Sequence, residues 1–328
     1  MLLIHTMLES TKFNTPSQVS SIFDIAKDTV LFLFLSCYYI LESLFWTLVP
    51  NMIRPMKSLK DEVILITGGA GGVGRQLAIK LARLGAKVVL WDVNKEALEK
   101  ACNALKDEGY QVASYIVDLT DRNCVYKAAE KVKKEVGKVD ILINNAGIVF
   151  GETLLELSDT AIETTYKVNI LSHYWTVKAF LPDMISTGKG HIVTMGSVTG
   201  LLGTYLCTDY SATKFATVGF HESLFTELRA HGHNGIHATL VCPSYINTGM
   251  FDGVTPRLTA MLEPDYVAET MIDSIRKNEV NCVIPGSVRY LLPLKCLLPA
   301  KMCWDLMYRV MKGPQTMMEL KKKPNRAT

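Results

Sequence analysis

Short apolar runs recur through most of the chain and alternate with longer segments of helical pattern. The runs cover residues 63–67, 87–92, 113–118, 139–147, 191–197, 237–243 and 281–286. Continuous apolar strands separated by helices are typical of a parallel sheet that is covered on both faces. The sequence therefore predicts a Rossmann-type, doubly wound α/β domain over residues 61–286. A length of 328 residues suits one large domain of this kind.

A second apolar feature precedes this domain. Residues 29–49, TVLFLFLSCYYILESLFWTLV, contain a single charged side chain, Glu42, and are long enough to cross a bilayer as a helix. We predict a membrane anchor there, with an N-terminal flank at 1–28 and a polar hinge at 50–60. A cleaved signal peptide is disfavoured because a long flank precedes the run and Pro50 follows it. A full span and a monotopic insertion both stay open, and Glu42 is easier to accommodate in the second.

Composition narrows the classes of partner. A net charge of +3 is too weak to indicate nucleic acid. The eight cysteines are scattered without CxxC pairs, which favours reduced thiols in a reducing compartment. His231, His233 and His237 lie close together in the sequence, but the glycines between them predict a loop rather than a metal site. We therefore expect no metal and no nucleic-acid partner.

A glycine cluster, TGGAGGVGR at residues 67–75, joins the first predicted strand to a helix. Glycines in this position allow a tight turn, let the backbone approach a pyrophosphate and direct a helix N-terminus at it. Asp92 ends the second strand, where its carboxylate can accept hydrogen bonds from ribose hydroxyls and repel a 2′-phosphate. The pattern predicts a dinucleotide site that prefers NAD to NADP. The alternative for Asp92 is a helix cap or a solvated strand end.

Tyr210 and Lys214 lie at positions i and i+4 in DYSATKFATVGF, a segment of helical pattern. Such residues share one face of a helix, so a phenol and an ammonium can lie in one pocket. The ammonium favours the phenolate, which would make Tyr210 a better base. The alternative is a surface pair in which Lys214 extends past a half-buried Tyr210.

Together these motifs resemble those of the short-chain dehydrogenases/reductases. Thr67, Gly68, Gly72 and Gly74 match the glycine motif TGxxxGxG of that family, and residues 144–147 match its NNAG turn. The resemblance implies an NAD cofactor held by a larger set of residues. That set is Thr67, Gly68, Gly72, Val73, Gly74, Asp92, Asp118, Leu119, Asn145, Ala146, Gly147, Tyr210, Lys214, Pro243, Ile246 and Thr248.

The resemblance also implies a catalytic tetrad of Asn169, Ser197, Tyr210 and Lys214. Tyr210 would take the alcohol proton while a hydride leaves for the nicotinamide, and Ser197 would hold the same oxygen. Lys214 would grip the nicotinamide ribose and help to lower the pKa of Tyr210. Asn169 would support a water chain for proton relay, or act as a buried amide that ties two strands together. One departure is Ser244, because many members of the family have glycine at that position.

A closer resemblance bears on the substrate. The anchor and several segments are similar to the membrane-bound branch of epidermal retinol dehydrogenases and lipid-droplet 17β-hydroxysteroid dehydrogenases. This implies oxidation of all-trans-retinol to retinal, with a steroid or fatty alcohol as the alternative and a catalytically silent, NAD-binding scaffold as another class. We expect an apolar pocket for a lipophilic alcohol. Its candidate residues are Leu201, Leu202, Leu206, Met250, Phe251, Leu258, Met261 and Leu262.

Location and assembly are also expectations at this point. Arg54, Lys57 and Lys60 follow the apolar run closely, which favours a cytosolic domain on an endoplasmic-reticulum anchor. Exchange with lipid droplets would require monotopic insertion, because a droplet has a single phospholipid layer. The family resemblance implies a homodimer through the helices around 160–180 and 211–230. The apolar and basic extension at 287–328 either touches the membrane or caps the domain.

Overall fold

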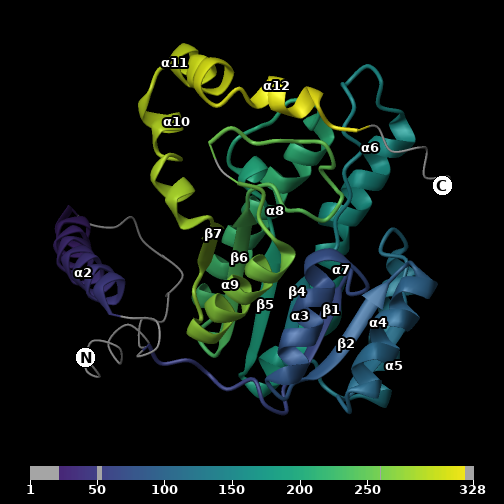
Figure 1. Ribbon diagram of the computed structural model, residues 1–328. Helices are drawn as coiled ribbons and strands as arrows, with labels where there is room; N and C mark the ends of the chain where they lie inside the picture. Colours follow the sequence, from purple (N-terminus) through teal and green to yellow (C-terminus); the bar gives the residue numbers. More distant parts are fainter. Residues whose placement is uncertain (1–21, 50–53, 259, 322–328) are drawn as a thin grey trace.

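The protein is represented by a computed structural model that describes residues 22–49, 54–258 and 260–321. Residues 1–21 of the predicted flank, 50–53 of the hinge and 322–328 of the extension lie outside the described residues. The centre is a seven-stranded parallel sheet with the order β3-β2-β1-β4-β5-β6-β7 (Figure 1). Its strands are β1 (Val63–Thr67), β2 (Lys87–Asp92), β3 (Val112–Ile116), β4 (Ile141–Asn144), β5 (Gly190–Met195), β6 (Ile236–Pro243) and β7 (Asn281–Ile284). The prediction of a doubly wound α/β fold is confirmed.

Helices cover both faces of the sheet (Figure 1). One face packs against α3 (Gly72–Arg83), α4 (Lys95–Asp107) and α9 (Pro264–Lys277). The other packs against α5 (Arg122–Glu135), α7 (Ser172–Thr187) and α8 (Thr208–Ala230). In the sheet, β1 lies between β2 and β4. The chain therefore winds in one direction from β1 to β3 and in the other from β4 to β7, and a parallel sheet has its ligand crevice where the direction changes, at the carboxyl ends of the strands.

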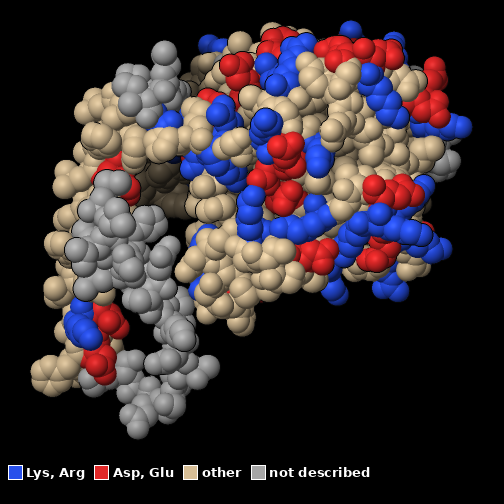
Figure 2. All heavy atoms as spheres, turned by 90° about the horizontal axis from the view of Figure 1, so that it is seen from below, with Lys and Arg blue, Asp and Glu red and all other residues tan. Residues whose placement is uncertain are grey.

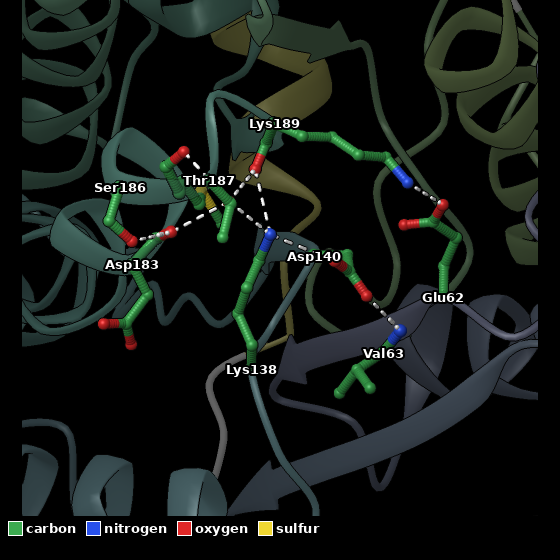
Figure 3. A network of polar contacts seen from close by, with 9 residues as sticks. Glu62, Val63, Lys138, Asp140, Asp183, Ser186, Thr187 and Lys189 are labelled. Atoms are coloured by element: carbon green, nitrogen blue, oxygen red, sulfur yellow. Dashed lines mark hydrogen bonds and ion pairs between the residues drawn. The ribbon is translucent and has the colours of Figure 1, made fainter.

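Polar residues hold together the amino ends of the central strands, at the opposite edge of the sheet (Figure 3). Asp140 accepts a hydrogen bond from the Val63 N–H at 2.9 Å, and its other oxygen lies 3.4 Å from Lys138 Nζ. Lys138 also donates to Thr187 Oγ1, and Lys189 pairs with Glu62. These contacts link the starts of β1, β4 and β5, so the base of the sheet is stabilised independently of the crevice.

The end of the predicted hinge lies against this base. The Lys57 N–H donates to the Arg276 carbonyl of α9, and the Lys57 carbonyl accepts from Arg276 Nε. Lys57 Nζ donates to His191 Nδ1 at 2.7 Å. His191 Nε2 lies 2.8 Å from the Thr239 hydroxyl, which donates to the Glu279 carbonyl at 2.6 Å. Because Lys57 only donates and Thr239 already uses its proton, His191 is neutral with its proton on Nε2.

Two buried histidines make stability dependent on pH. Burial lowers the pKa of His173 on α7 to about 3, with a further contribution from Lys214; burial and Lys57 lower the pKa of His191 well below its usual value. In the unfolded chain both bind a proton near pH 6.5, so their stabilising effect is present above that pH and is lost on acidification. We expect the free energy of unfolding to fall by about 2 kcal/mol per histidine between pH 7 and pH 5.

Denaturant unfolding at the two pH values measures this fall. His173→Leu should reduce the fall, whereas His231→Gln in an exposed loop should leave it unchanged. An equal fall in wild type and His173→Leu would contradict the prediction.

The N-terminal apolar helix is α2 (Ile22–Leu48), and it lies apart from the α/β body (Figure 1). The helix begins at Ile22, before the predicted start of the anchor at Thr29, and so includes the more polar segment Ile22–Asp28. Residues 22–46 are long and apolar enough to cross a membrane by length and composition, and none of their most apolar stretch is buried against the rest of the protein. Many large side chains of α2, Phe32 and Leu41 among them, are about two-thirds exposed.

The C-terminal extension leaves β7 and crosses the top of the body above α8 (Figure 1). It consists of short helical pieces: η4 (Gly286–Tyr290), α10 (Leu294–Leu297), α11 (Ala300–Asp305), η5 (Leu306–Val310) and α12 (Gly313–Met318). The last of them is anchored, since Met317 is fully buried. The extension therefore caps the domain at the carboxyl edge of the sheet, one of the two roles expected for it.

Candidate active site

The glycine cluster forms a tight turn between β1 and α3. Gly68 and Gly72 have φ values of 64° and 51°, which L side chains rarely adopt. A Cβ at Gly74 would lie 2.1 Å from the Gly68 carbonyl oxygen, so only glycine allows this approach of α3. Gly71 caps α3 without a side-chain hydrogen bond, whereas Asn94 and Asp121 cap α4 and α5 with theirs. The amides that begin α3 are thus left for a ligand.

The turn after β4 supports the glycine turn. Thr67 Oγ1 accepts hydrogen bonds from the N–H groups of Asn145 and Ala146, at 3.0 and 3.1 Å. Asn145 Nδ2 donates in return to the carbonyls of Thr67 and Gly68, at 2.9 and 3.2 Å. Thr67 and Asn145 therefore join the two loops that border the crevice, and both are structural as well as candidate cofactor residues.

Asp92 is held beside the same turn by two backbone amides. Its Oδ2 accepts from Ala70 and its Oδ1 from Asn94, both at 3.0 Å. Asp92 does not cap a helix, since Asn94 is the N-cap of α4. Each of its carboxylate oxygens keeps a second lone pair that could accept from a ribose hydroxyl. Asp118 is exposed and accepts two hydrogen bonds from Thr120. Val73 and Leu119, two further residues of the predicted cofactor set, pack into the two sheet cores.

Tyr210 and Lys214 point into the same buried region of α8. They are 6% and 2% exposed, so the surface pair is wrong. Lys214 Nζ lies 5.6 Å from the centre of the Tyr210 ring and donates to the Met195 carbonyl at 2.7 Å. Burial lowers the pKa of Lys214 to about 8. Burial also raises the pKa of Tyr210 well above its usual value, while the Ser197 hydrogen bond acts in the opposite direction.

The raised pKa of Tyr210 differs from the sequence-based expectation that Lys214 lowers it. Lys214 lies beside Tyr210, yet desolvation of the phenol outweighs any benefit from the ammonium. The protein part of the site on its own therefore keeps Tyr210 protonated at neutral pH.

Asn169 lies at the centre of a short π-helical stretch, η2 (Lys167–Leu171), between α6 (Asp159–Tyr166) and α7. Its amide exchanges two hydrogen bonds of 2.9 Å with the backbone of Ile148 and donates to Thr213 at 3.2 Å. The side chain is a buried amide, as the structural alternative predicted, but it ties the loop after β4 to α8 rather than two strands to each other. A Cβ at Gly147 would lie 3.5 Å from Asn169 Oδ1 and 3.8 Å from Lys214 Nζ, so these groups line one space.

Ser197 is positioned by η3 (Val198–Gly200) and β6. It accepts from the Thr199 N–H at 3.2 Å and donates to the Pro243 carbonyl at 3.4 Å. Gly200 was not predicted, yet a Cβ there would lie 2.5 Å from the Lys214 carbonyl oxygen. Its lack of a side chain lets the Ser197 loop approach α8. Only its place three residues after Ser197 hinted at this role.

The loop after β6 reaches back over the glycine turn. A Cβ at Gly72 would lie 3.1 Å from Thr248 Cγ2, so Thr248 borders the crevice from above. Ile246 packs against the core beneath it. Ser244 donates its N–H to the Ile284 carbonyl at 2.8 Å and does not have a positive φ. A serine in place of the usual glycine therefore fits the loop without strain.

An apolar cluster covers the other side of Tyr210. Its buried members are Cys207, Tyr210, Phe251, Val254 and Met317, and the Phe251 ring is 6.1 Å from that of Tyr210. Four of the predicted pocket residues join it, namely Leu206, Met250, Phe251 and Met261. The other four predicted residues are not part of this cluster: Leu258 is exposed, Leu262 belongs to the sheet core, Leu201 lines a different cavity, and Leu202 is not among the cluster's members.

No motif in the sequence indicated the C-terminal members of this cluster. Met317 is fully buried in it, and Leu320 packs against it. The same stretch is tied down by the Lys321 N–H, which donates to the Asp252 carbonyl at 2.9 Å. Among the described residues, no three His, Cys, Asp or Glu side chains lie together as metal ligands would.

Comparisons with known proteins agree with this geometry. The model of the short chain dehydrogenase family matches residues 62–258. Human epidermal retinol dehydrogenase 2 is 42% identical over 285 residues, which cover 85% of this chain and 91% of that protein. Rat estradiol 17-beta-dehydrogenase 11 is 39% identical over 274 residues, with 84% and 91% covered.

Solved structures show the same architecture. A short chain dehydrogenase/reductase from Burkholderia phymatum in complex with NAD has a TM-score of 0.69 and 25% identity, covering 83% of this chain and all of the other. A metagenomic short-chain oxidoreductase in complex with NADP has a TM-score of 0.59 and 27% identity, covering 69% and 96%. One relative is bound to each dinucleotide, so these comparisons indicate an NAD(P) cofactor without choosing between the two.

Proposed function

Because the chain belongs to the short-chain dehydrogenase/reductase family, we propose that it is a membrane-associated, NAD-dependent oxidoreductase of lipophilic alcohols. The first candidate reaction is the oxidation of all-trans-retinol to retinal. The observation that carries this proposal is the position of Tyr210 between two surroundings. Lys214 and Ser197 lie beside Tyr210, and Tyr210 is also part of an apolar cluster.

The described residues fit a nicotinamide dinucleotide. Gly68 and Gly72 have the positive φ values of a tight turn, Gly74 lets α3 approach the Gly68 carbonyl, and the amides at the start of α3 have no side-chain cap. We assign the pyrophosphate to this turn, the adenosine ribose to Asp92 and the carboxamide to Thr248. When bound, the nicotinamide would accept the hydride from the carbinol carbon of the substrate.

The chain's own groups would handle the proton. The Tyr210 oxygen would accept it from the alcohol, and the Ser197 hydroxyl would hold the same substrate oxygen as charge develops there. Lys214 would orient the nicotinamide ribose and stabilise the phenolate, with its Nζ fixed by the Met195 carbonyl. Asn169 would keep the loop after β4 in register with α8 and support a water chain for proton relay.

Cofactor choice provides one prediction. If the Asp92 charge excludes a 2′-phosphate, Asp92→Asn should narrow the preference for NAD over NADP by about tenfold or more, since it removes the charge and keeps the shape. Comparing kcat/KM with the two cofactors measures the change. Glu96→Gln, at the start of the neighbouring helix α4, is the matched control. An unchanged ratio in Asp92→Asn would show that its carboxylate does not face the 2′-position.

The substrate class requires a direct test. Membranes containing the full chain are supplied with all-trans-retinol, estradiol or long-chain alcohols, with NAD and with NADP. Retinal formation with NAD is the expected result. The steroid alternative has support in the 39% identity to estradiol 17-beta-dehydrogenase 11. No oxidation of any alcohol would favour the silent scaffold instead.

The proposed location is the endoplasmic-reticulum membrane with the α/β body in the cytosol, in exchange with lipid droplets if insertion is monotopic. Protease added to sealed microsomes should then digest the body without detergent. The basic residues after the anchor and the cysteines without disulfides support this side. Full protection until detergent is added would place the body in the lumen.

We also propose a homodimer through α7 and α8. Tyr174 and Phe215, at 44% and 41% exposure, are apolar side chains that such an interface would cover. Sedimentation in detergent measures the oligomeric state.

A further inference from the structure

The extension after β7 exposes an unusual number of large apolar side chains. Five large side chains within this short stretch of sequence are between 53% and 76% exposed: Tyr290, Leu297, Met302, Trp304 and Tyr308. Clusters of this kind on a surface mark a site of contact with another molecule or with lipid. Tryptophan and tyrosine in particular favour the boundary between a bilayer and water.

The charges of the extension favour a phospholipid surface. Between residues 287 and 312, five residues are basic and one, Asp305, is acidic. Asp305 is already paired with Arg309 at 3.2 Å. The underside of the α/β body differs, because basic and acidic side chains are intermixed there (Figure 2). Apolar and aromatic residues interleaved with basic ones are typical of segments that lie in the headgroup region of a bilayer containing anionic lipid.

The position of the extension agrees with the anchor. Arg54, the first described residue after the gap that follows α2, lies 3.9 Å from Glu279, two residues before β7 begins. The extension begins at the other end of β7, which is an edge strand of the sheet. The linker from the anchor and the extension therefore lie at opposite ends of one short edge strand, on the same side of the body.

The inner side of the extension packs against the body and against the apolar cluster that contains Tyr210. Lys295 Nζ donates to the Leu201 carbonyl at 2.9 Å, and Leu292 helps to line a cavity of about 230 Å³ with Leu201 and Val218. Further along, Met317 is packed in the apolar cluster around Tyr210. One continuous segment thus runs from the exposed apolar side chains to the wall of the candidate substrate site.

We propose that residues 287–312 form a second membrane-contact surface, which lies in the headgroup region of the bilayer that carries α2. This contact places the apolar side of the site at the lipid surface, where a lipophilic alcohol is dissolved. The second part rests on the proposed function, whereas lipid contact does not.

Trp304 serves as the probe of lipid contact. The full chain with Trp46→Phe, which removes the tryptophan of α2, is reconstituted in nanodiscs of phosphatidylcholine and phosphatidylserine with or without brominated acyl chains. Bromine quenches tryptophan only at close range, so a clear loss of emission that disappears on Trp304→Phe is the expected result. Tryptophan emission that bromination leaves unchanged would overturn the proposal. Crosslinking of two copies of the chain through the extension, without quenching of Trp304, would show that a second copy covers Trp304 instead of lipid and would also overturn it.

A kinetic experiment separates this proposal from the proposed function. Leu297→Glu with Tyr308→Glu should raise the KM for an alcohol dissolved in vesicles severalfold and leave kcat/KM for a short water-soluble alcohol unchanged. Leu84→Glu, at the exposed end of α3, is the control. An unaltered KM for the vesicle substrate would reject delivery from the membrane. If no alcohol is oxidised by the wild type, the proposed function fails, and the quenching result still decides lipid contact.

Discussion

Replacing Tyr210 by phenylalanine should lower kcat by about two orders of magnitude or more, because no other described group in the site is placed to accept the alcohol proton. The change removes one hydroxyl from a side chain that is 6% exposed and leaves the ring packed against Phe251. Folding and cofactor affinity should therefore remain close to those of the wild type. Initial rates of NADH formation, together with a dinucleotide titration, separate the two effects.

Tyr115 provides the matched control for this substitution. It is also a buried tyrosine, and its hydroxyl donates to Glu135 at 2.9 Å, but it lies on β3 at the far edge of the sheet. Tyr115→Phe should keep its kcat. If Tyr210→Phe retained near-normal turnover with the cofactor bound, the proton step would have to use another group and the proposed mechanism would be wrong.

The sheet was predictable because burial on both faces demands continuous apolar strands. Two of the predicted runs, 63–67 and 87–92, coincide with β1 and β2. The run at 139–147 gave a shorter strand, since Asn145 and Ala146 turn away to bond Thr67. The sequence pattern identifies the strand, but the hydrogen bonds that end it are accepted by Thr67, which is far away in the chain.

The candidate site was predictable in its spacing and not in its energetics. Tyr210 and Lys214 lie together because both are on one helix, which is a local property. The raised pKa of Tyr210 comes from burial, and the apolar cluster that contains Tyr210 includes Phe251 and Met317 from distant segments of the chain. For the same reason the sequence offered two roles for the extension after residue 286 and no sign that Met317 belongs to the same cluster as Tyr210.

The glycine turn should be as sensitive to substitution as Tyr210. In Gly74→Ala the added Cβ would lie 2.1 Å from the Gly68 carbonyl oxygen and 2.8 Å from Asn145 Nδ2. The first of these contacts is with backbone, which no side-chain rotation relieves. Helix α3 must then move away from the turn, and the amides that would hold the pyrophosphate move with it. We expect NAD affinity to fall by more than about tenfold, with stability lower by roughly 1–3 kcal/mol from overpacking.

Gly71, three residues earlier in the same turn, shows whether the effect is specific. A Cβ there meets no protein atom within 4 Å, and its backbone is extended, with φ of −143°. Gly71→Ala should therefore keep its melting temperature and bind NAD within a few-fold of wild type. Calorimetric titration with NAD and thermal unfolding of both variants make the comparison. Equal losses in the two variants would indicate that any side chain in the turn is harmful, and normal binding by Gly74→Ala would show that the dinucleotide does not use this turn.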